Sequence, residues 1–216
     1  EYTVSTSGIF STEELLTLID TVKEGDIPDK KFPSYFGKFI SEYLTLSPED
    51  EYRAGDILAS EYYSYAMKSR NRFVSSWFEF NLNLNNIQTA ISARKYKLDV
   101  ASAIVGDTEV CELLRVSNAR DFGLGETLTY LENIQRIAEI DDLVEREKKT
   151  DQLKWDWLET ESFFNYFTVE RLFVFLLQLE MIERWISLDK DKGNELFRAM
   201  IKALKDDVQI PEEFRN

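Results

Sequence analysis

The acidic string DDLVE, at residues 141 to 145, has the residue types and the spacing of a metal-binding motif. On a helix, Asp141, Asp142 and Glu145 would lie near one another, because positions three and four residues apart are neighbours on a helix surface. Carboxylate oxygens are the ligands that Mg²⁺ prefers. The string therefore allows a Mg²⁺ site, but the charged residues that follow it, EREKKTDQ, are also typical of a solvated helix face.

The same string resembles the aspartate-rich motif of class I terpene cyclases, and this resemblance implies an Mg²⁺-dependent isoprenoid enzyme. Those all-α enzymes also carry a second metal-binding helix with an Asn/Asp, Ser/Thr and Glu series. No such series follows residue 145. The enzyme therefore remains an alternative, and we expect a non-catalytic chain with no catalytic residue, cofactor-binding residue or metal ligand.

Other kinds of chemistry are limited by composition, because the chain contains no histidine. This excludes a Ser-His-Asp triad, a Cys-His pair and the Glu-x-x-His helix of di-iron proteins. There is no G-x-x-x-x-G-K-[ST] loop, and GLGE at 123 to 126 lacks the spacing of a dinucleotide fold. The single cysteine, Cys111, cannot form an internal disulfide and is expected to fill the core in a reducing compartment.

A formal net charge of -14 limits the classes of molecule that the chain is expected to bind. Nucleic-acid binding needs clustered Lys and Arg, so we expect no nucleic acid and favour basic protein surfaces instead. The longest apolar run, LFVFLLQL at 172 to 179, is far shorter than the roughly 20 residues that span a bilayer. No transmembrane segment is expected.

The distribution of glycine and proline predicts an all-α fold, since neither residue occurs in 56 to 105 or in 126 to 192. The segment FEFNLNLNN at 78 to 86 alternates like a β-strand, but the wider pattern favours a helix. Its apolar residues continue a stripe spaced 4, 3, 4, 3, 4 that comprises Phe73, Trp77, Phe80, Leu84, Ile87 and Ile91. The remaining surface of this helix is expected to carry Asn81, Asn85 and Gln88.

Start signals and periodicity predict the other helices. Ser11 with Glu14 makes a capping box, Ser47 precedes an N1 proline, and Asp107 is a candidate N-cap. We expect no strand. The sequence contains two groups of aromatic residues. Tyr62, Tyr63 and Tyr65 suit helix packing or a partner surface. The second group lies beside the second long apolar helix and is expected in the core: Trp155, Trp157, Phe163, Phe164, Tyr166 and Phe167. The predicted helices are 12–24, 31–45, 56–95, 108–116, 126–149, 152–188 and 194–205.

An internal repeat is indicated by an offset of 95 residues, which pairs eight identical residues among the 19 positions of 74–92 and 169–187. Two copies of one helical unit would explain this match, but so would any two buried helices rich in Phe and Leu. The first explanation predicts one all-helical domain, 1–216, with repeated units 51–120 and 121–216 after an N-terminal segment, 1–50.

Two segments carry a resemblance to the C subunit of V/A-type rotary ATPases, called d in the eukaryotic vacuolar enzyme. FNLNLNNIQTAISARK at 80 to 95 matches a helix of that family through Asn86, Ile87 and Arg94, with Asn83 where the family often has aspartate. FTVERLFVFLLQLEMIERW at 167 to 185 is similar to a later helix through Glu180, Ile182 and Arg184. The chain also resembles a bacterial family of unassigned function that is encoded beside V-type ATPase genes.

The resemblance implies an all-helical socket that sits on the membrane rotor ring, receives the central shaft and passes torque between them, in an enzyme of ion or proton transport. We therefore expect these ATPase subunits as partners, and a cytoplasmic protein that is peripheral to the membrane through them. Asn86, Arg94, Glu180 and Arg184 are the candidate structural or partner-contact residues. A helical adaptor unrelated to ATPases is the remaining alternative.

Overall fold

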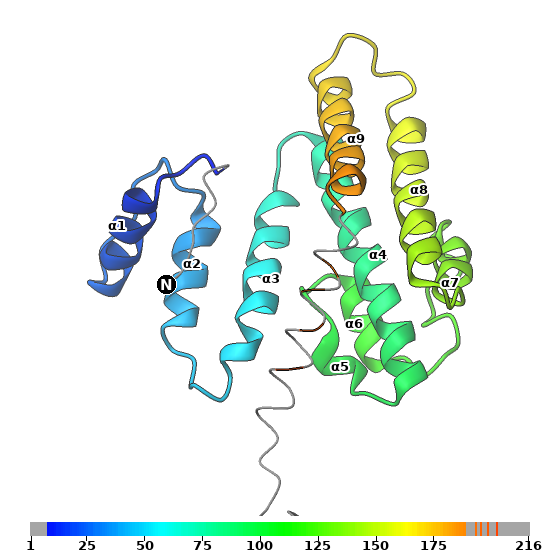
Figure 1. Cartoon of the computed structure of the whole chain (residues 1–216), viewed down its shortest axis with the longest axis horizontal. Helices are drawn as coiled ribbons and strands as arrows, with labels where there is room; N and C mark the ends of the chain where they lie inside the picture. The colour runs from blue at the N-terminus through cyan, green and yellow to red at the C-terminus, as the bar shows by residue number, and fades with distance from the viewer. Residues whose placement is uncertain (1–7, 189–192, 194, 196–197, 199–201, 203–216) are drawn as a thin grey trace, which may run out of the picture. The chain divides into compact units, whose positions relative to one another are not determined.

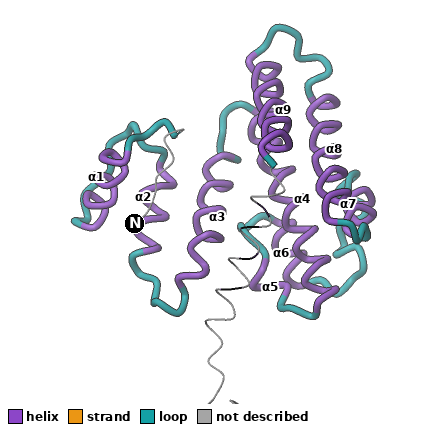
Figure 2. The backbone as a smooth tube through the Cα atoms, in the orientation of Figure 1, coloured by secondary structure: helices purple, strands orange, loops and turns teal. Residues whose placement is uncertain are grey.

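The computed structural model describes residues 8–188 together with 193, 195, 198 and 202, and over this part of the chain it contains helices and no strand (Figures 1 and 2). The predicted all-α fold class is confirmed. The helices are α1 (Thr12–Lys23), α2 (Ser34–Tyr43), the 3₁₀ turn η1 (Glu51–Arg53), α3 (Ala54–Ala66), α4 (Arg72–Tyr96), α5 (Val100–Ala103), α6 (Glu109–Val116), α7 (Leu131–Ala138), α8 (Leu143–Glu161) and α9 (Val169–Ser187).

The chain divides into two compact units, Glu1–Glu161 and Ser162–Asn216. The first contains α1 to α8, and the second contains α9. The repeat boundary expected between residues 120 and 121 lies inside the first unit. No helix within the described residues is long and apolar enough to cross a membrane.

The first unit is built around α4, which contacts α3, α5, α6, α7 and α8. FEFNLNLNN lies wholly inside this helix, so the helical interpretation of the alternating pattern is confirmed. The predicted stripe faces the core: Trp77, Phe80, Leu84 and Ile87 are buried. Asn81 is also buried, against the expectation that it lies on the surface. Its amide donates to the carbonyl of Trp77 one turn earlier, which satisfies it inside the helix.

Aromatic stacking closes the core over this stripe. Trp157 of α8 stacks on Phe80, with ring centroids 5.0 Å apart and an interplanar angle of 11°. Tyr130, just before α7, meets the same ring edge-on at 5.0 Å, and Trp77 lies 5.6 Å from Trp157. Such geometries suit the ring quadrupoles and add to the gain from burial. Trp157 is thus half-buried and packs against this core, which agrees with the prediction for this one member of its aromatic group.

The helices α1 and α2 form a smaller core of their own around Leu18, Phe32 and Ile40. Tyr35 of α2 extends this core to α3, with its ring 5.5 Å from Tyr62 and 5.4 Å from Tyr65. The tyrosine cluster of α3 thus takes part in helix packing, which was one of its two predicted roles.

Helix starts follow capping chemistry, with corrections at two predicted caps. The capping box of Ser11 and Glu14 is present at α1. The N-cap of α6 is Thr108 and not Asp107, because the Thr108 hydroxyl accepts from the N–H of Cys111. Ser47 does not start a helix either; its hydroxyl donates to Asp50, and α3 begins only after η1.

Three predicted helices prove to be interrupted, because polar caps start new helices without any glycine or proline. The range 56–95 contains the break between α3 and α4, where Asn71 caps α4. The range 126–149 contains the break between α7 and α8, and 152–188 contains the one where Thr168 caps α9. The sequence analysis predicted no helix at α5, and the predicted helix 194–205 lies outside the continuously described residues.

Candidate functional site

The four residues that the sequence singled out lie on two helices. Asn86 and Arg94 belong to α4 in the first unit, two turns apart on its C-terminal half. Glu180 and Arg184 belong to α9 in the second unit, where both are exposed and the Arg184 guanidinium lies 5.4 Å from the ring of Trp185.

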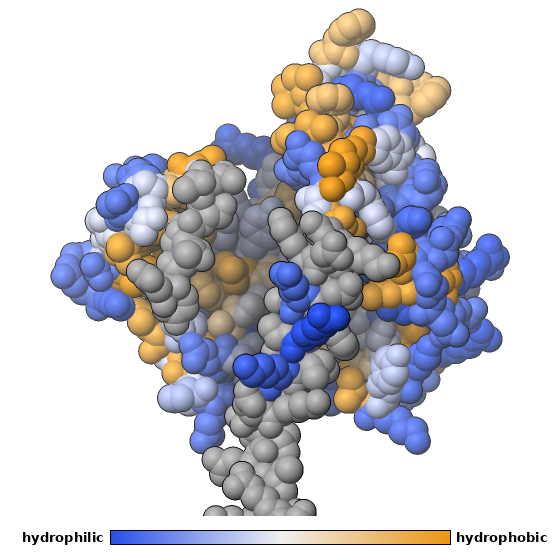
Figure 3. All heavy atoms as spheres, in the orientation of Figure 1, coloured by the Kyte–Doolittle hydropathy of each residue, from blue (hydrophilic) through white to orange (hydrophobic). Residues whose placement is uncertain are grey.

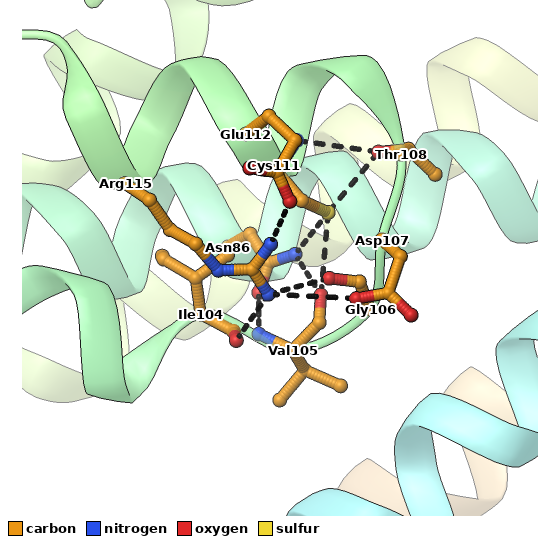
Figure 4. A network of polar contacts seen from close by, with 9 residues as sticks. All are labelled: Asn86, Ile104, Val105, Gly106, Asp107, Thr108, Cys111, Glu112 and Arg115. Atoms are coloured by element: carbon orange, nitrogen blue, oxygen red, sulfur yellow. Dashed lines mark hydrogen bonds and ion pairs between the residues drawn. The ribbon is translucent and has the colours of Figure 1, made fainter.

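Asn86 holds the loop between α5 and α6 (Figure 4). Its Nδ2 donates to the carbonyl of Val105 at 2.7 Å, and its Oδ1 accepts from the N–H of the same residue at 3.1 Å. Nδ2 also lies 3.3 Å from the sulfur of Cys111, as a second contact. Asn86 is buried, and these bonds supply its amide with the partners that a buried polar group requires.

The other side of the same loop is fastened by Arg115 of α6. Its Nη2 donates to the carbonyl of Ile104 at 3.1 Å and to that of Gly106 at 2.6 Å, while Nη1 pairs with Glu112 at 2.6 Å (Figure 4). The loop needs glycine at 106, where φ is +85° and an added Cβ would lie 3.2 Å from Leu82 Cδ2. Asn86 and the close approach of Gly106 to Leu82 thus hold the loop against α4, and Arg115 holds it against α6.

The buried thiol of Cys111 completes this network. It donates to the carbonyl of Val105 at 3.3 Å and accepts from the hydroxyl of Thr108 at 3.0 Å. Cys111 is fully buried and free, in agreement with its predicted place in the core. Its contacts serve the fold and leave the sulfur enclosed.

Arg94 fastens a second loop, the one between α6 and α7. Nη1 donates to the carbonyl of Ala119 at 2.6 Å, and Nη2 donates to that of Ser117 at 2.5 Å. Its guanidinium lies 3.7 Å from the ring centroid of Phe122, a buried residue whose φ is +57°. A planar guanidinium can donate in two directions and stack at once, which an ammonium cannot.

Asn83, at the position where the resembling family often has aspartate, is buried beside Tyr130. Its Nδ2 lies 3.2 Å from the tyrosine hydroxyl, while its Oδ1 has no hydrogen-bond partner. Burial raises the pKa of Tyr130, and the contact with Asn83 offsets part of that rise. An ionised carboxylate at this position would be costly to bury, which fits an asparagine here.

The acidic string does not form the carboxylate cluster that the sequence allowed. Asp141 and Asp142 precede α8, and the carboxylate of Asp142 accepts from the N–H of Glu145 at 2.7 Å as a helix cap. Asp141 pairs with Lys95 at 3.2 Å, and Glu145 lies 3.9 Å from Lys149. No group of three or more acidic or thiol ligands that suits a metal occurs among the described residues.

An open groove of about 1180 Å³ follows the loop between α1 and α2 and reaches α3. Two of its three lysines are in ion pairs, Lys31 with Glu14 at 2.8 Å and Lys38 with Glu61 at 3.3 Å. The groove wall is thus of mixed charge, without a convergent set of reactive groups.

Sequence reasoning missed the roles of Arg115 and Gly106, although the glycine before a capped helix was a usable signal of a constrained loop. It was also wrong about the aromatic residues between α8 and α9. Phe163, Phe164, Tyr166 and Phe167 are exposed and not part of the core. The spacing of these aromatic residues along the sequence resembles that of core residues. They lie in and after the turn that begins at Ser162, where α8 has already ended.

Comparison with known proteins identifies a family but no characterised relative. No curated protein and no solved structure gives a significant match to the chain. A family model described as "Protein of unknown function (DUF2764)" matches residues 1–208, which is nearly the whole chain. The chain therefore belongs to the DUF2764 family.

Proposed function

We propose that this protein is a non-catalytic subunit of a V/A-type rotary ATPase, a helical socket that couples the central shaft to the membrane rotor ring. The observation that carries the proposal is the structure of the two resembling segments. The segment 80–95 lies within α4, and 167–185 comprises the start and most of α9. Each segment thus supplies most of a long helix, as a coupling subunit made of repeated helical units requires.

The polar residues shared with the resembling family support a mechanical role on α4. Asn86 and Arg94 bind backbone carbonyls of two different loops and so join α4 to α6 and to the segment before α7. Fixing loops in this way stiffens the bundle around its central helix. A part that passes torque has to resist deformation, and this is the kind of stiffening that it needs.

The acidity of the chain supports basic protein partners. Its net charge of -14 would attract positively charged patches on a shaft or on ring loops. The protein would then be peripheral to the membrane and held there by the other subunits, on the cytoplasmic side. Part of the contact would be electrostatic, so it should weaken when salt shortens the Debye length below about 8 Å.

Purification through an affinity tag on this protein, from detergent-solubilised native membranes, tests the proposal. We expect shaft and ring subunits of the ATPase to co-purify and the yield to fall as salt rises. A matched preparation tagged on an ATPase subunit should contain this protein in return. Recovery of the complete ATPase without this protein, together with no ATPase subunit in the first preparation, would rule out the assignment.

A further inference from the structure

The helix α9 exposes a continuous apolar stripe with coiled-coil spacing. Leu172, Phe175, Leu179, Ile182 and Ile186 follow one another at intervals of 3, 4, 3 and 4 residues, which is the pattern of a and d positions in a heptad. All five are exposed; Leu172 is 70% exposed and Phe175 is 64% exposed. Val169 and Leu176 widen the stripe and are exposed as well. The buried residues of α9, Val174 and Gln178, lie on another face.

The corresponding stripe of α4 is covered. Moved by 95 residues, the positions of the α9 stripe coincide with Trp77, Phe80, Leu84, Ile87 and Ile91 of α4. Trp77 is 5% exposed, Phe80 is 2% exposed, and Leu84 and Ile87 are fully buried. The two helices thus carry the same apolar pattern, but only one has it packed.

The helices that cover α4 indicate what such a stripe accepts. α7 and α8 contact α4, and Trp157 of α8 and Tyr130 before α7 lie against the Phe80 ring. The covering elements are amphipathic helices that present aromatic side chains. An apolar helix face with the same pattern is therefore suited to another amphipathic helix.

The loop before α9 extends the same apolar surface. Phe163, Phe164, Tyr166 and Phe167 are all exposed, and Phe167 is completely so. The loop is ordered by a turn, in which the N–H of Asn165 donates to the carbonyl of Ser162, and by Arg171, which donates to the Ser162 hydroxyl at 2.8 Å. Phe167 has a φ of +55°, which is rare for a bulky residue. Figure 3 shows hydrophobic side chains gathered at this loop and along α9.

The net charge of the chain favours a basic partner over a second copy of the chain. Glu180 and Glu183 are exposed on α9, as are Arg171 and Arg184, and the heptad positions that flank the stripe carry Glu183 at e and Arg171 at g. The Arg171 guanidinium already donates to the Ser162 hydroxyl. A second copy would bring the same net charge of -14, and like charges repel at an interface. Anionic lipid headgroups would be repelled in the same way.

We propose that α9 and the loop before it, residues 163–186, form a docking surface for an amphipathic helix of a partner protein, with apolar and aromatic residues along its seam and Lys or Arg beside it. The contact would be the intermolecular counterpart of the packing on α4. The inference does not rest on the proposed function, since it concerns the chemistry of the contact and applies equally to a partner outside the ATPase.

Fluorescence anisotropy with a designed peptide tests the proposal. The probe is a labelled helical peptide with Leu and Trp at a and d and Lys at e and g, titrated with the full-length protein. Two matched peptides serve as controls, one with Glu in place of Lys and one with the same composition in scrambled order. We expect the Lys peptide to bind at least tenfold more tightly than either control.

Protein variants locate the site. Phe175→Gln and Ile182→Gln should each weaken binding of the Lys peptide at least tenfold, and the double variant should weaken it further. Leu98→Gln is the control, because Leu98 is an exposed apolar residue of the first unit. It should bind as the parent does. Circular dichroism confirms that each variant keeps its helices, and Ile186→Gln, at a 78% exposed position, provides a further variant at the end of the stripe.

Four results would overturn the proposal. Equal binding by the parent and the stripe variants would place the peptide elsewhere. Dimers in sedimentation that Phe175→Gln dissociates would identify a second copy as the occupant. Partition of the protein into neutral phosphatidylcholine vesicles without peptide binding would identify a membrane. Peptide binding that begins only after removal of residues 189–216 would identify the chain's own tail.

Discussion

The side-chain amide of Asn86 pairs with the backbone of one residue, Val105, through two hydrogen bonds of 2.7 and 3.1 Å. The amide donates to the carbonyl of Val105 and accepts from its N–H, so both backbone groups of this loop residue have a partner on α4. This joins the central helix α4 to a loop 19 residues further along the chain. Arg94 joins the same helix to the loop between α6 and α7 through the carbonyls of Ser117 and Ala119.

Replacing Asn86 by alanine should destabilise the protein by about 1 to 3 kcal/mol, because it removes two hydrogen bonds and leaves the N–H of Val105 without its partner. Urea unfolding, followed by circular dichroism, measures this loss. Asn85→Ala is the matched control, since Asn85 is exposed and its amide meets only the hydroxyl of Tyr63. Its cost should stay below about 1 kcal/mol. Equal losses for both variants would contradict the structural role of Asn86.

Two glycine substitutions should have opposite effects. Gly106→Ala places a Cβ at 3.2 Å from Leu82 in a backbone with φ +85°, so we expect a loss of at least about 1 kcal/mol. Gly55→Ala lies in α3 with nothing within 4 Å, and alanine has the higher helix propensity. It should stabilise by up to about 1 kcal/mol. Thermal unfolding of both variants checks the signs, and a gain from Gly106→Ala would contradict the loop geometry.

Arg94→Lys should destabilise by about 1 to 3 kcal/mol, although it keeps the charge. Lysine cannot donate to the carbonyls of Ser117 and Ala119 while it stacks on Phe122. Arg136→Lys is the control, because Arg136 is exposed and pairs only with Glu132 on its own helix. Its effect should stay within about 0.5 kcal/mol. If chemical denaturation gives the two variants the same midpoint, Arg94 does not hold the loop.

Stability should fall at alkaline pH partly because of Tyr130. Burial raises the pKa of its hydroxyl in the folded protein above the unfolded value of about 10. The folded state therefore binds the proton more strongly, so this stabilisation is present below pH 10 and is lost as pH rises through the folded pKa. Tyr130→Phe should flatten the decline in the free energy of unfolding above pH 10. An identical pH profile for the variant would show that Tyr130 is not buried as described.

Much of the fold followed from the sequence, because periodicity and capping are local. The stripe of α4 and the capping box at Ser11 are examples, since their evidence lies within a few residues. The breaks before α8 and α9 were harder to predict. Asp142 and Thr168 cap these helices, but both residue types also occur inside helices, so the sequence alone does not mark them as caps. The exposure of Phe167 could not be predicted, since aromatic spacing alone does not say which faces are packed.

The candidate residues were predictable as positions but not as contacts. Resemblance singled out Asn86 and Arg94, yet their partners lie 19 to 25 residues away in loops, and no local pattern indicates which helix such a loop contacts. The partners of the acidic string could not be predicted for the same reason. Its spacing suits a metal, but Asp141 is paired with Lys95, which is distant in the sequence.

The acidic string offers a direct test of the alternative enzyme. Changing Asp141 and Asp142 to asparagine should leave folding nearly intact, because asparagine also caps helices and exposed ion pairs contribute little. Isothermal titration with Mg²⁺ should give no tight binding for either protein. Tight binding by the parent that the double variant loses would favour the isoprenoid enzyme.

The proposed coupling of the shaft to the ring can be measured as the number of ions transported per ATP hydrolysed. Inverted membrane vesicles from cells with and without the protein allow both rates to be measured together. Without the protein, we expect hydrolysis to continue while transport is largely lost, and we expect addition of the parent protein to restore transport. An unchanged ratio of transport to hydrolysis in its absence would show that the protein does not couple the shaft to the ring.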